Sequence, residues 1–148
     1  MEIRNAEVDV ESQSLVESYK VSVFDKNLEG YLSIFDKDIR VFDMWKDWSC
    51  DGIQSWRKVT EEWFSSLEEA RVSVEFSEPS EFVFKDSAVF TAFVKFAALN
   101  LEGQVLRHHQ ERLTWALRRN NGQWKVFHAH TSSPTDPSTL RPILTISK

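Results

Sequence analysis

The sequence is poor in cysteine, proline and glycine, and each shortage excludes a class of protein. Its one cysteine, Cys50, excludes an internal disulfide and a multi-cysteine zinc site. Four prolines and four glycines among 148 residues are too few for a collagen-like or low-complexity chain. No apolar run reaches the roughly 18 residues of a membrane-spanning helix, and the opening residues lack the apolar segment of a signal peptide. We therefore expect a soluble cytoplasmic protein with no membrane partner.

The charge balance also lacks a basic excess. The 18 Lys and Arg residues stand against 23 Asp and Glu residues, which gives a formal net charge of −5. Because proteins bind nucleic acids through clustered cationic side chains, we expect no nucleic-acid partner. The length is typical of a single domain, so we expect one domain over residues 1–148. Within it, residues 1–8 are expected to be ragged and residues 134–148 to form an extended tail.

Three helices are predicted in the first half of the chain. From about residue 9 onward, Leu15, Tyr19 and Val23 recur every four residues, which is the spacing of one helix face. Asn27 can cap a second, short helix with its side chain. A third helix is expected after Gly52, where apolar residues again recur at intervals of three and four.

The second half of the chain favours long antiparallel strands separated by turns. The strand-like runs are residues 72–76, 82–84, 88–99, 105–118 and 124–131. Pro79 interrupts the first two runs, as at an edge or a bulge, and Asn121-Gly122 is a strong hairpin signal. The order of elements predicts an α+β fold in which a cone-shaped, curved antiparallel sheet packs on three amino-terminal helices. Such a cone leaves a cavity at its wide end, which the many aromatic side chains can line.

Two stretches of sequence, together with this order of elements, carry a family resemblance. The first runs from Ser18-Tyr19 through Asn27–Gly30 to Asp38–Asp43, and the second from Glu111 to Pro134. They resemble the nuclear transport factor 2-like superfamily, with its cystatin-like fold. The first stretch is similar to the ketosteroid isomerases. The second is similar to SnoaL-like proteins and to the association domain of calcium/calmodulin-dependent protein kinase II.

Asp43 is the first candidate catalytic residue. Alternation places it on one strand face with Ile39, Val41 and Trp45. A carboxylate among apolar side chains is poorly solvated, which raises its pKa and makes it a better base near neutral pH. The resemblance implies the same role, since Asp43 corresponds to the general base of the isomerase. The alternative is that the alternation slips near the strand end and that Asp43 faces water.

The resemblance also assigns a catalytic role to Tyr19, which corresponds to the oxyanion tyrosine of the isomerase. A phenol in a dry cavity can donate a hydrogen bond to a developing enolate. The correspondence breaks around it: the buried carboxylic acid of the isomerase corresponds to Thr114, and its two supporting tyrosines to Phe35 and Thr60. A steroid isomerase is therefore not favoured. The alternative for Tyr19 is an amphipathic tyrosine of the core.

Arg112 and Thr114 are candidate ligand-binding residues because they alternate on one strand face. A guanidinium aimed into a cavity binds a carboxylate or an enolate oxygen in bidentate fashion. The resemblance supports this assignment, because the kinase association domain has a pocket arginine at the position of Thr114. The alternative for Arg112 is a salt bridge at the rim.

Five further residues complete the predicted ligand site. Trp45 shares the strand face of the candidate base. Val59 and Trp63 lie on one stripe of the third helix and are expected in both core and pocket wall. By the resemblance, Phe127 and Thr131 face the pocket.

His128 and His130 have the spacing of a metal-binding pair on a strand. A third ligand would be needed, and His108 and His109 are the other histidines of the chain. Histidines of the core or an interface, with ordinary hydrogen bonds, are the favoured interpretation. We therefore expect no metal and no cofactor.

Two functions stay open at this point. The first is a small-molecule pocket protein. Its most concrete form is a cofactor-independent isomerase or cyclase that moves a proton next to a carbonyl of a small apolar or carboxylate-bearing ligand. The second is a non-enzymatic association module like the kinase domain. Leu113, Trp115 and Leu117 share the alternate face of their strand and are too apolar for solvent, which predicts a homodimer through the outer sheet face.

Overall fold

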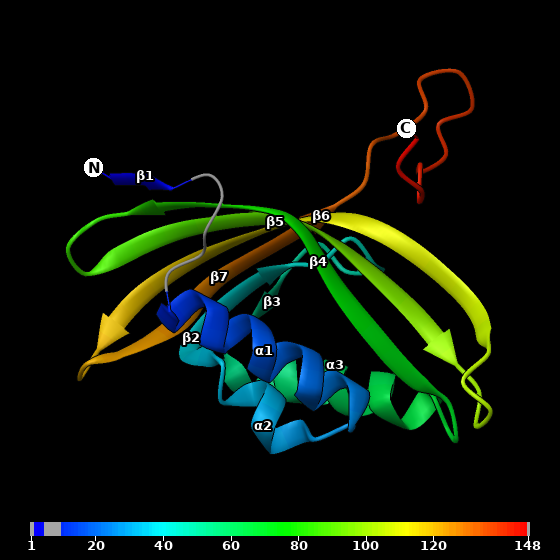
Figure 1. Cartoon of the computed structure of the whole chain (residues 1–148), viewed down its shortest axis with the longest axis horizontal. Coiled ribbons are helices and arrows are strands. Elements are labelled where there is room, and N and C mark those ends of the chain that lie inside the picture. Colours follow the sequence, from blue (N-terminus) through cyan, green and yellow to red (C-terminus); the bar gives the residue numbers. More distant parts are fainter. Residues whose placement is uncertain (1, 5–9, 148) are drawn as a thin grey trace.

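A computed structural model describes residues 2–4 and 10–147, with side chains from residue 12 onward. Within these residues the chain forms three helices and seven strands. The helices are α1 (Val10–Phe24), α2 (Leu28–Leu32) and α3 (Ile53–Ser66). The strands are β1 (Glu2–Arg4), β2 (Phe35–Phe42), β3 (Cys50–Asp51), β4 (Arg71–Val83), β5 (Ser87–Leu99), β6 (Val105–Asn120) and β7 (Gln123–Ser132). Figure 1 shows the strands as one strongly curved layer that arches over the helices.

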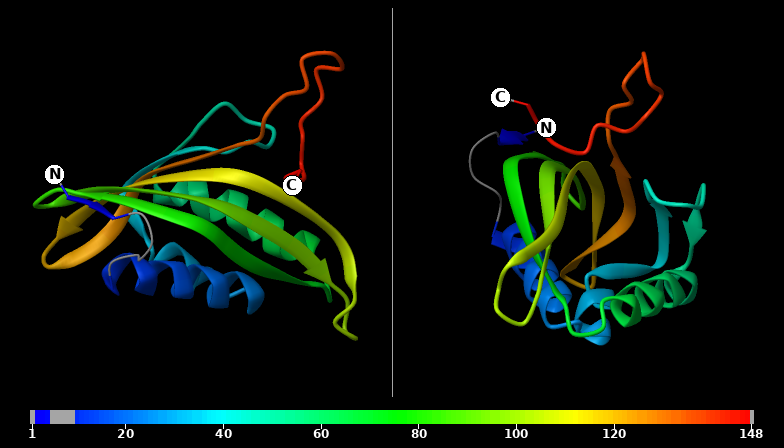
Figure 2. Two further views of the ribbon diagram at one scale, coloured as in Figure 1. Left: turned by 45° about the horizontal axis from the view of Figure 1, so that its top comes forward. Right: turned by 90° about the vertical axis from the view of Figure 1, so that its right-hand side faces the viewer.

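The sheet has the strand order β1-β4-β5-β6-β7-β2-β3. Strands β4 to β7 pair antiparallel with their neighbours, as the turn signals predict. Strand β2 runs parallel to β7, so the sheet is mixed rather than wholly antiparallel. A parallel pair needs a long connection, which here consists of β3, α3 and the strands from β4 to β6. The predicted α+β class, with a curved sheet over amino-terminal helices, is confirmed (Figure 2).

The helix starts follow local signals in the sequence. The side chain of Asn27 accepts a hydrogen bond from the Gly30 N–H at 3.0 Å, so it caps α2 as predicted. Gly52 stands directly before α3 with φ at 88°, a conformation that a residue without Cβ adopts at no steric cost. On α1, Tyr19 and Val23 are buried against the sheet and α2. The helices therefore turn their apolar stripes toward the concave face of the sheet.

The turns and one bulge set the register of the long strands. Asn121 and Gly122 both have positive φ, at 52° and 76°, which is the conformation of a tight hairpin between β6 and β7. The pairing of β4 with β5 shifts register between Ser77 and Ser80, around Pro79. The proline therefore bulges one continuous strand and does not divide it in two.

The face of β6 that was predicted to form a dimer interface lies inside the molecule. Leu113, Trp115 and Leu117 are only 3%, 1% and 0% exposed and belong to the main hydrophobic core. They cannot form an outer surface, so that prediction is wrong. Because side chains alternate across a strand, Arg112 and Thr114 occupy the opposite, outer face.

Both ends of the chain differ from the expected irregular start and extended tail. Residues 2–4 pair with β4 as strand β1, whereas residues 1 and 5–9 lie outside the described part. The tail turns back after Pro134, whose carbonyl accepts a hydrogen bond from the Ile143 N–H at 2.7 Å. The N–H of Gln110 on β6 then donates to the Leu144 carbonyl at 2.8 Å. The tail thus closes against β6 beyond the end of β7.

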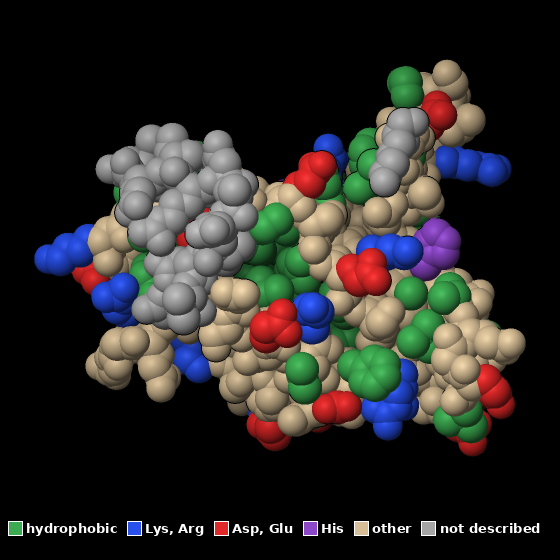
Figure 3. All heavy atoms as spheres, in the orientation of Figure 1, with side chains coloured by type: hydrophobic (Ala, Val, Ile, Leu, Met, Phe, Trp, Pro, Cys, Tyr) green, Lys and Arg blue, Asp and Glu red, His purple; other side chains and the backbone are tan. Residues whose placement is uncertain are grey.

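Charges of both signs are mixed on the surface. On the face drawn in Figure 3, lysine and arginine side chains lie among aspartates and glutamates. None of the helices in the described ranges is long and apolar enough to cross a bilayer.

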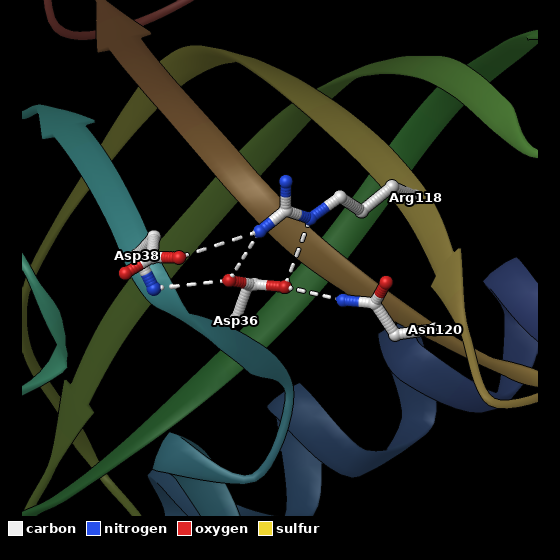
Figure 4. A network of polar contacts seen from close by, with 4 residues as sticks. All are labelled: Asp36, Asp38, Arg118 and Asn120. Carbon is white, nitrogen blue, oxygen red and sulfur yellow. Dashed lines mark hydrogen bonds and ion pairs between the residues drawn. The ribbon is translucent and has the colours of Figure 1, made fainter.

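A partly buried ion pair joins the start of β2 to the end of β6, across the intervening strand β7 (Figure 4). Asp36 is 4% exposed, and the Arg118 guanidinium donates to its two oxygens at 3.0 and 2.8 Å. The Asn120 amide and the Asp38 backbone N–H each donate to the same carboxylate at 2.9 Å. The hydrogen bonds from Arg118 hold the pKa of Asp36 below its ordinary value.

Asp36→Asn is expected to lower the free energy of unfolding by about 2 kcal/mol at neutral pH, because a charged hydrogen-bonded pair is lost. The lowered pKa means that the ionised carboxylate stabilises the fold. This contribution is present above the unfolded-state pKa and is lost as the pH falls through the folded-state pKa. Urea denaturation should therefore show the two proteins converging in acid.

The matched control is Asp38→Asn. The Asp38 side chain is 70% exposed and 3.7 Å from Arg118, and its loss is expected to cost less than about 0.5 kcal/mol. A stability difference for Asp36→Asn that stays the same from neutral to acid pH would contradict the account.

Candidate functional site

A cavity of about 560 Å³ lies between the concave face of the sheet and the helices. Its wall is largely aromatic, and the rings come from all three helices and from the central strands. They include Tyr19, Tyr31, Trp56, Trp63, Phe96 and Trp115. The volume is in the range of roughly 300–1,000 Å³ that small-molecule sites occupy. The hollow is therefore of a size and character that suit a compact apolar ligand.

Asp43 follows the last residue of β2 and lies in the wall of this cavity. The Thr131 hydroxyl donates to its Oδ1 at 2.9 Å and itself accepts from the Met44 N–H at 3.0 Å. Burial raises the pKa of Asp43, and the hydrogen bonds from Thr131 and Met44 and the charge of His109 offset only part of that rise. The carboxyl is thus held in one position and is a stronger base than an exposed aspartate.

Tyr19 and Tyr31 lie side by side deeper in the cavity, with ring centroids 5.2 Å apart. Burial, the largest cause, raises the pKa of both phenols well above the ordinary value, and the charges of Glu111 and Asp43 raise both further. Both side chains therefore stay neutral. A neutral phenol donates a hydrogen bond, so the pair can stabilise negative charge that develops on a bound oxygen.

A second acid, Glu111, lies in the same cavity and was not among the predicted site residues. It is 6% exposed, and its Oε2 is 3.1 Å from Nε2 of His109. Burial raises the pKa of Glu111, as does the negative charge of Asp43, while the hydrogen bond and charge of His109 lower it in part. The cavity therefore holds two acids and one imidazole in mutual electrostatic contact.

The strand pattern itself contained the signal for Glu111. It stands two residues before Leu113 and four before Trp115, so it shares their face of β6. His109 stands two residues earlier again. Because Leu113, Trp115 and Leu117 lie in the core, Glu111 and His109 on the same strand face also point inward, toward the cavity.

Trp45, Val59, Trp63 and Thr131, which were predicted at the ligand site, line the cavity. Trp45 is 48% exposed and stands at the mouth.

Arg112 and Thr114 do not line the cavity. The Arg112 Nε donates to the Ser132 hydroxyl at 3.1 Å, and the Arg112 side chain is exposed. The reason is that the predicted orientation of β6 was wrong by one residue. Such an error puts every side chain of the strand on the wrong face. A carboxylate-binding role for Arg112 inside the cavity is therefore wrong.

Phe127 is also outside the cavity, for a different reason. The pairing of β6 with β7 changes register there: Leu117 faces Val126, but Ala116 faces His128. Phe127 is the extra residue of a bulge, so Val126 and Ala129 are both buried although three positions separate them. The Phe127 ring packs under the Arg118 guanidinium at 5.4 Å instead.

The mouth of the cavity carries polar and charged residues that were not among the predicted site residues. Lys46 and Asp47 contribute from the loop after β2, and Arg107 and His108 from the start of β6. Leu144 of the folded-back tail completes this edge. Cationic side chains are thus available near the entrance, where an anionic group on a ligand can contact both them and water.

The pair His128 and His130 packs against Phe42, with ring centroids 5.0 and 5.5 Å from it. The Arg40 carbonyl lies 2.8 Å from Nδ1 of His128. In the part of the chain that the structure describes, no group of three His, Cys, Asp or Glu residues has the geometry to hold a metal ion.

The comparisons with known proteins agree with this architecture. The model of the SnoaL-like domain matches residues 13–136. An NTF2-like protein of unknown function from Pseudomonas putida KT2440 superposes with a TM-score of 0.81 at 21% identity, covering 93% of this chain and 94% of that one. A protein of unknown function with a cystatin-like fold from Nostoc punctiforme gives 0.68 at 18% identity, covering 87% and 91%. An NTF2-like protein with a cystatin-like fold from Novosphingobium aromaticivorans gives 0.71 at 13% identity, covering 82% and 78%.

A search of functionally curated proteins gives no significant match. At identities this low, the structural likeness shows the fold alone.

The raised pKa of Asp43 predicts how Asp43→Asn changes the pH dependence of stability. A raised folded-state pKa means that the stabilising contribution is present below the unfolded-state pKa and is lost as the pH rises through the folded-state pKa. Asparagine keeps the acceptor for Thr131 but does not ionise. The variant is therefore expected to gain stability relative to the wild type in urea denaturation as the pH rises from the unfolded-state pKa, about 3.9, through the raised folded-state pKa.

The control for loss of a carboxylate is Asp86→Asn, at an exposed turn. If Asp43→Asn instead loses stability relative to the wild type over the same rise in pH, Asp43 is not desolvated.

Proposed function

The chain belongs to the SnoaL-like domain family, and on that basis we propose that it binds a small, mostly apolar carbonyl compound and moves a proton next to the carbonyl. The observation that carries this proposal is Asp43, a carboxylate with a raised pKa in the wall of an aromatic cavity. A base of this kind is suited to remove a weakly acidic proton near neutral pH.

In the proposed reaction, Asp43 removes a proton from the carbon beside the carbonyl. Thr131 holds one carboxylate oxygen, which leaves the other to receive the proton. The electron pair of the broken C–H bond moves toward the carbonyl oxygen. Tyr31 donates a hydrogen bond to the resulting enolate, and Tyr19 supports it through a hydrogen bond to Tyr31. Asp43 then returns the proton at the same or another carbon. Isomerisation and cyclisation both use this sequence, which needs no cofactor.

The cavity wall supports the proposed class of ligand. The rings of Tyr19, Tyr31 and Trp63 present flat apolar surfaces, against which a ring or a branched hydrocarbon packs well. The buried part of the wall offers few polar partners beyond the two acids, the two phenols and one imidazole. A ligand that carries a carboxylate would direct it to Lys46 or Arg107 at the mouth.

Asp43→Asn tests the proposed reaction. Removal of a general base is expected to lower the rate by about 10²–10⁴-fold. The measurement is turnover of a panel of β,γ-unsaturated ketones and β-dicarbonyl compounds, followed by absorbance and by proton exchange in D₂O. Quenching of tryptophan fluorescence reports binding separately, because Trp45, Trp56 and Trp63 line the cavity.

Asp86→Asn is the matched control and is expected to retain full activity. Ligand binding without any difference in turnover between wild type and Asp43→Asn would leave a binding protein and refute catalysis at this residue.

We also propose that the protein forms a homodimer through the outer face of the sheet. The contact residues cannot be Leu113, Trp115 and Leu117, because these are buried in the core. The outer face carries Phe93, Thr114 and Phe127, which are half-buried in the isolated chain. Sheet faces with aromatic side chains of intermediate exposure are suited to close packing with a second copy.

Phe93→Glu tests this interface. Burial of a charge on each side of a symmetric contact is expected to shift a dimer to monomers in light scattering at micromolar concentration. Val21→Glu, at a 56% exposed position on α1, should leave the dimer intact. A monomeric wild type would contradict the proposal.

A further inference from the structure

A second proton-transfer group faces the cavity from β6. Nε2 of His109 lies 3.1 Å from Oε2 of the buried Glu111, so Nε2 is the ring nitrogen that faces the acid. Within residues 12–147, Nδ1 of His109 makes no hydrogen bond. The imidazole therefore has one nitrogen held by a carboxyl and one nitrogen free, which is the arrangement of an oriented acid or base.

The plane of the His109 ring is also fixed. Phe96 stacks on it with centroids 5.1 Å apart and planes 9° apart. Trp45 meets it edge to face at 5.3 Å and 87°. With a ring on one side, a second ring at its edge and a carboxyl on Nε2, the imidazole has little freedom to rotate. The free Nδ1 accordingly keeps one direction.

Asp43 and His109 belong to one electrostatic group although they come from different strands. His109 lowers the pKa of Asp43, and the charge of Asp43 raises the pKa of Glu111. Both residues line the same cavity, Asp43 from the end of β2 and His109 from β6. A ligand that occupies the cavity can contact both side chains.

We propose that His109, positioned by Glu111, is a second catalytic residue of this cavity, and that the reaction is reversible loss of water from a β-hydroxy carbonyl compound with an apolar body. This inference rests on the proposed function. It goes beyond proton transfer at Asp43 because isomerisation needs one group that shuttles a proton, whereas loss of water needs a base and a separate acid.

The proposed step balances without a cofactor. Asp43 takes the proton from the carbon beside the carbonyl, and the electrons of that C–H bond form the new carbon–carbon double bond. The bond from the β-carbon to its hydroxyl breaks, and the hydroxyl leaves as water after it receives the Nδ1 proton of protonated His109. The products are the unsaturated carbonyl compound, water, neutral His109 and protonated Asp43. Solvent returns the proton from Asp43 to His109.

Two probes of the same skeleton separate the two proposals. The aldol adduct of benzaldehyde and acetone reports loss of water, because its product, benzylideneacetone, absorbs in the near ultraviolet. Benzylacetone has no hydroxyl, so in D₂O it reports only proton exchange at the carbon beside the carbonyl. Asp43→Asn is expected to lose both reactions. His109→Asn should lower water loss by about 10²-fold, a much larger loss than it causes in exchange.

Glu111→Gln tests the positioning role. It is expected to lower kcat for water loss without raising KM and to change exchange on benzylacetone far less, since Glu111 acts through the imidazole. A merely structural role would instead change both reactions together. Glu75→Gln, an exposed position on β4, is the matched control.

His130→Asn, on an exposed ring away from the cavity, is the control for loss of a histidine and should behave as the wild type. If His109→Asn lowers the melting temperature strongly, His109→Gln provides the same test with a longer side chain. Equal rates of water loss in the wild type and in a folded His109 variant overturn this inference while exchange at Asp43 persists. Absence of exchange in the wild type overturns the proposed function as well.

Discussion

The alternation of side chains along β6 decides what the cavity of this protein contains. Leu113, Trp115 and Leu117 must leave water, so they turn to the concave face, and the period of two carries Glu111 and His109 inward with them. The same rule puts Arg112 on the outer face. The polar chemistry of the cavity thus follows from the burial of three apolar residues that are themselves inert.

Local signals were enough to predict the three helices, the long strands and the position of Asp43. Helix caps, the Asn121-Gly122 hairpin and strand alternation act over a few residues, and the structure contains each of them. Asp43 was predictable for the same reason, because it follows Ile39 and Val41 in one alternating run.

The predicted orientation of β6 was wrong because it followed the family resemblance. An error of one residue in such an alignment reverses the face of every side chain. The alternation of Leu113, Trp115 and Leu117 already pointed to the core. The bulge at Phe127 had no comparable signal in the sequence. It arises where β7 must follow both β6 and the parallel strand β2, which is a constraint of the assembled sheet. The contact between Trp45 and His109 also had no local signal, because it joins segments more than 60 residues apart in the sequence.

Two aspartates at opposite ends of β2 show how environment separates structural from chemical roles. Asp36 is buried, but a guanidinium, an amide and a backbone N–H stabilise its charge, and its pKa falls. Asp43 has one hydroxyl and one backbone N–H to offset desolvation, and its pKa rises.

A carboxylate whose charge is fully stabilised is a poor base, because proton uptake breaks the contacts that hold it. A carboxylate whose charge is stabilised only in part loses few favourable contacts when it accepts a proton. Asp36 can therefore hold strands together but is a poor base, whereas Asp43, whose pKa is raised, is the stronger base of the two. The two residues differ in the number of hydrogen-bond donors around the carboxylate. The aromatic wall, which leaves few donors near Asp43, is also the surface on which a ligand would pack.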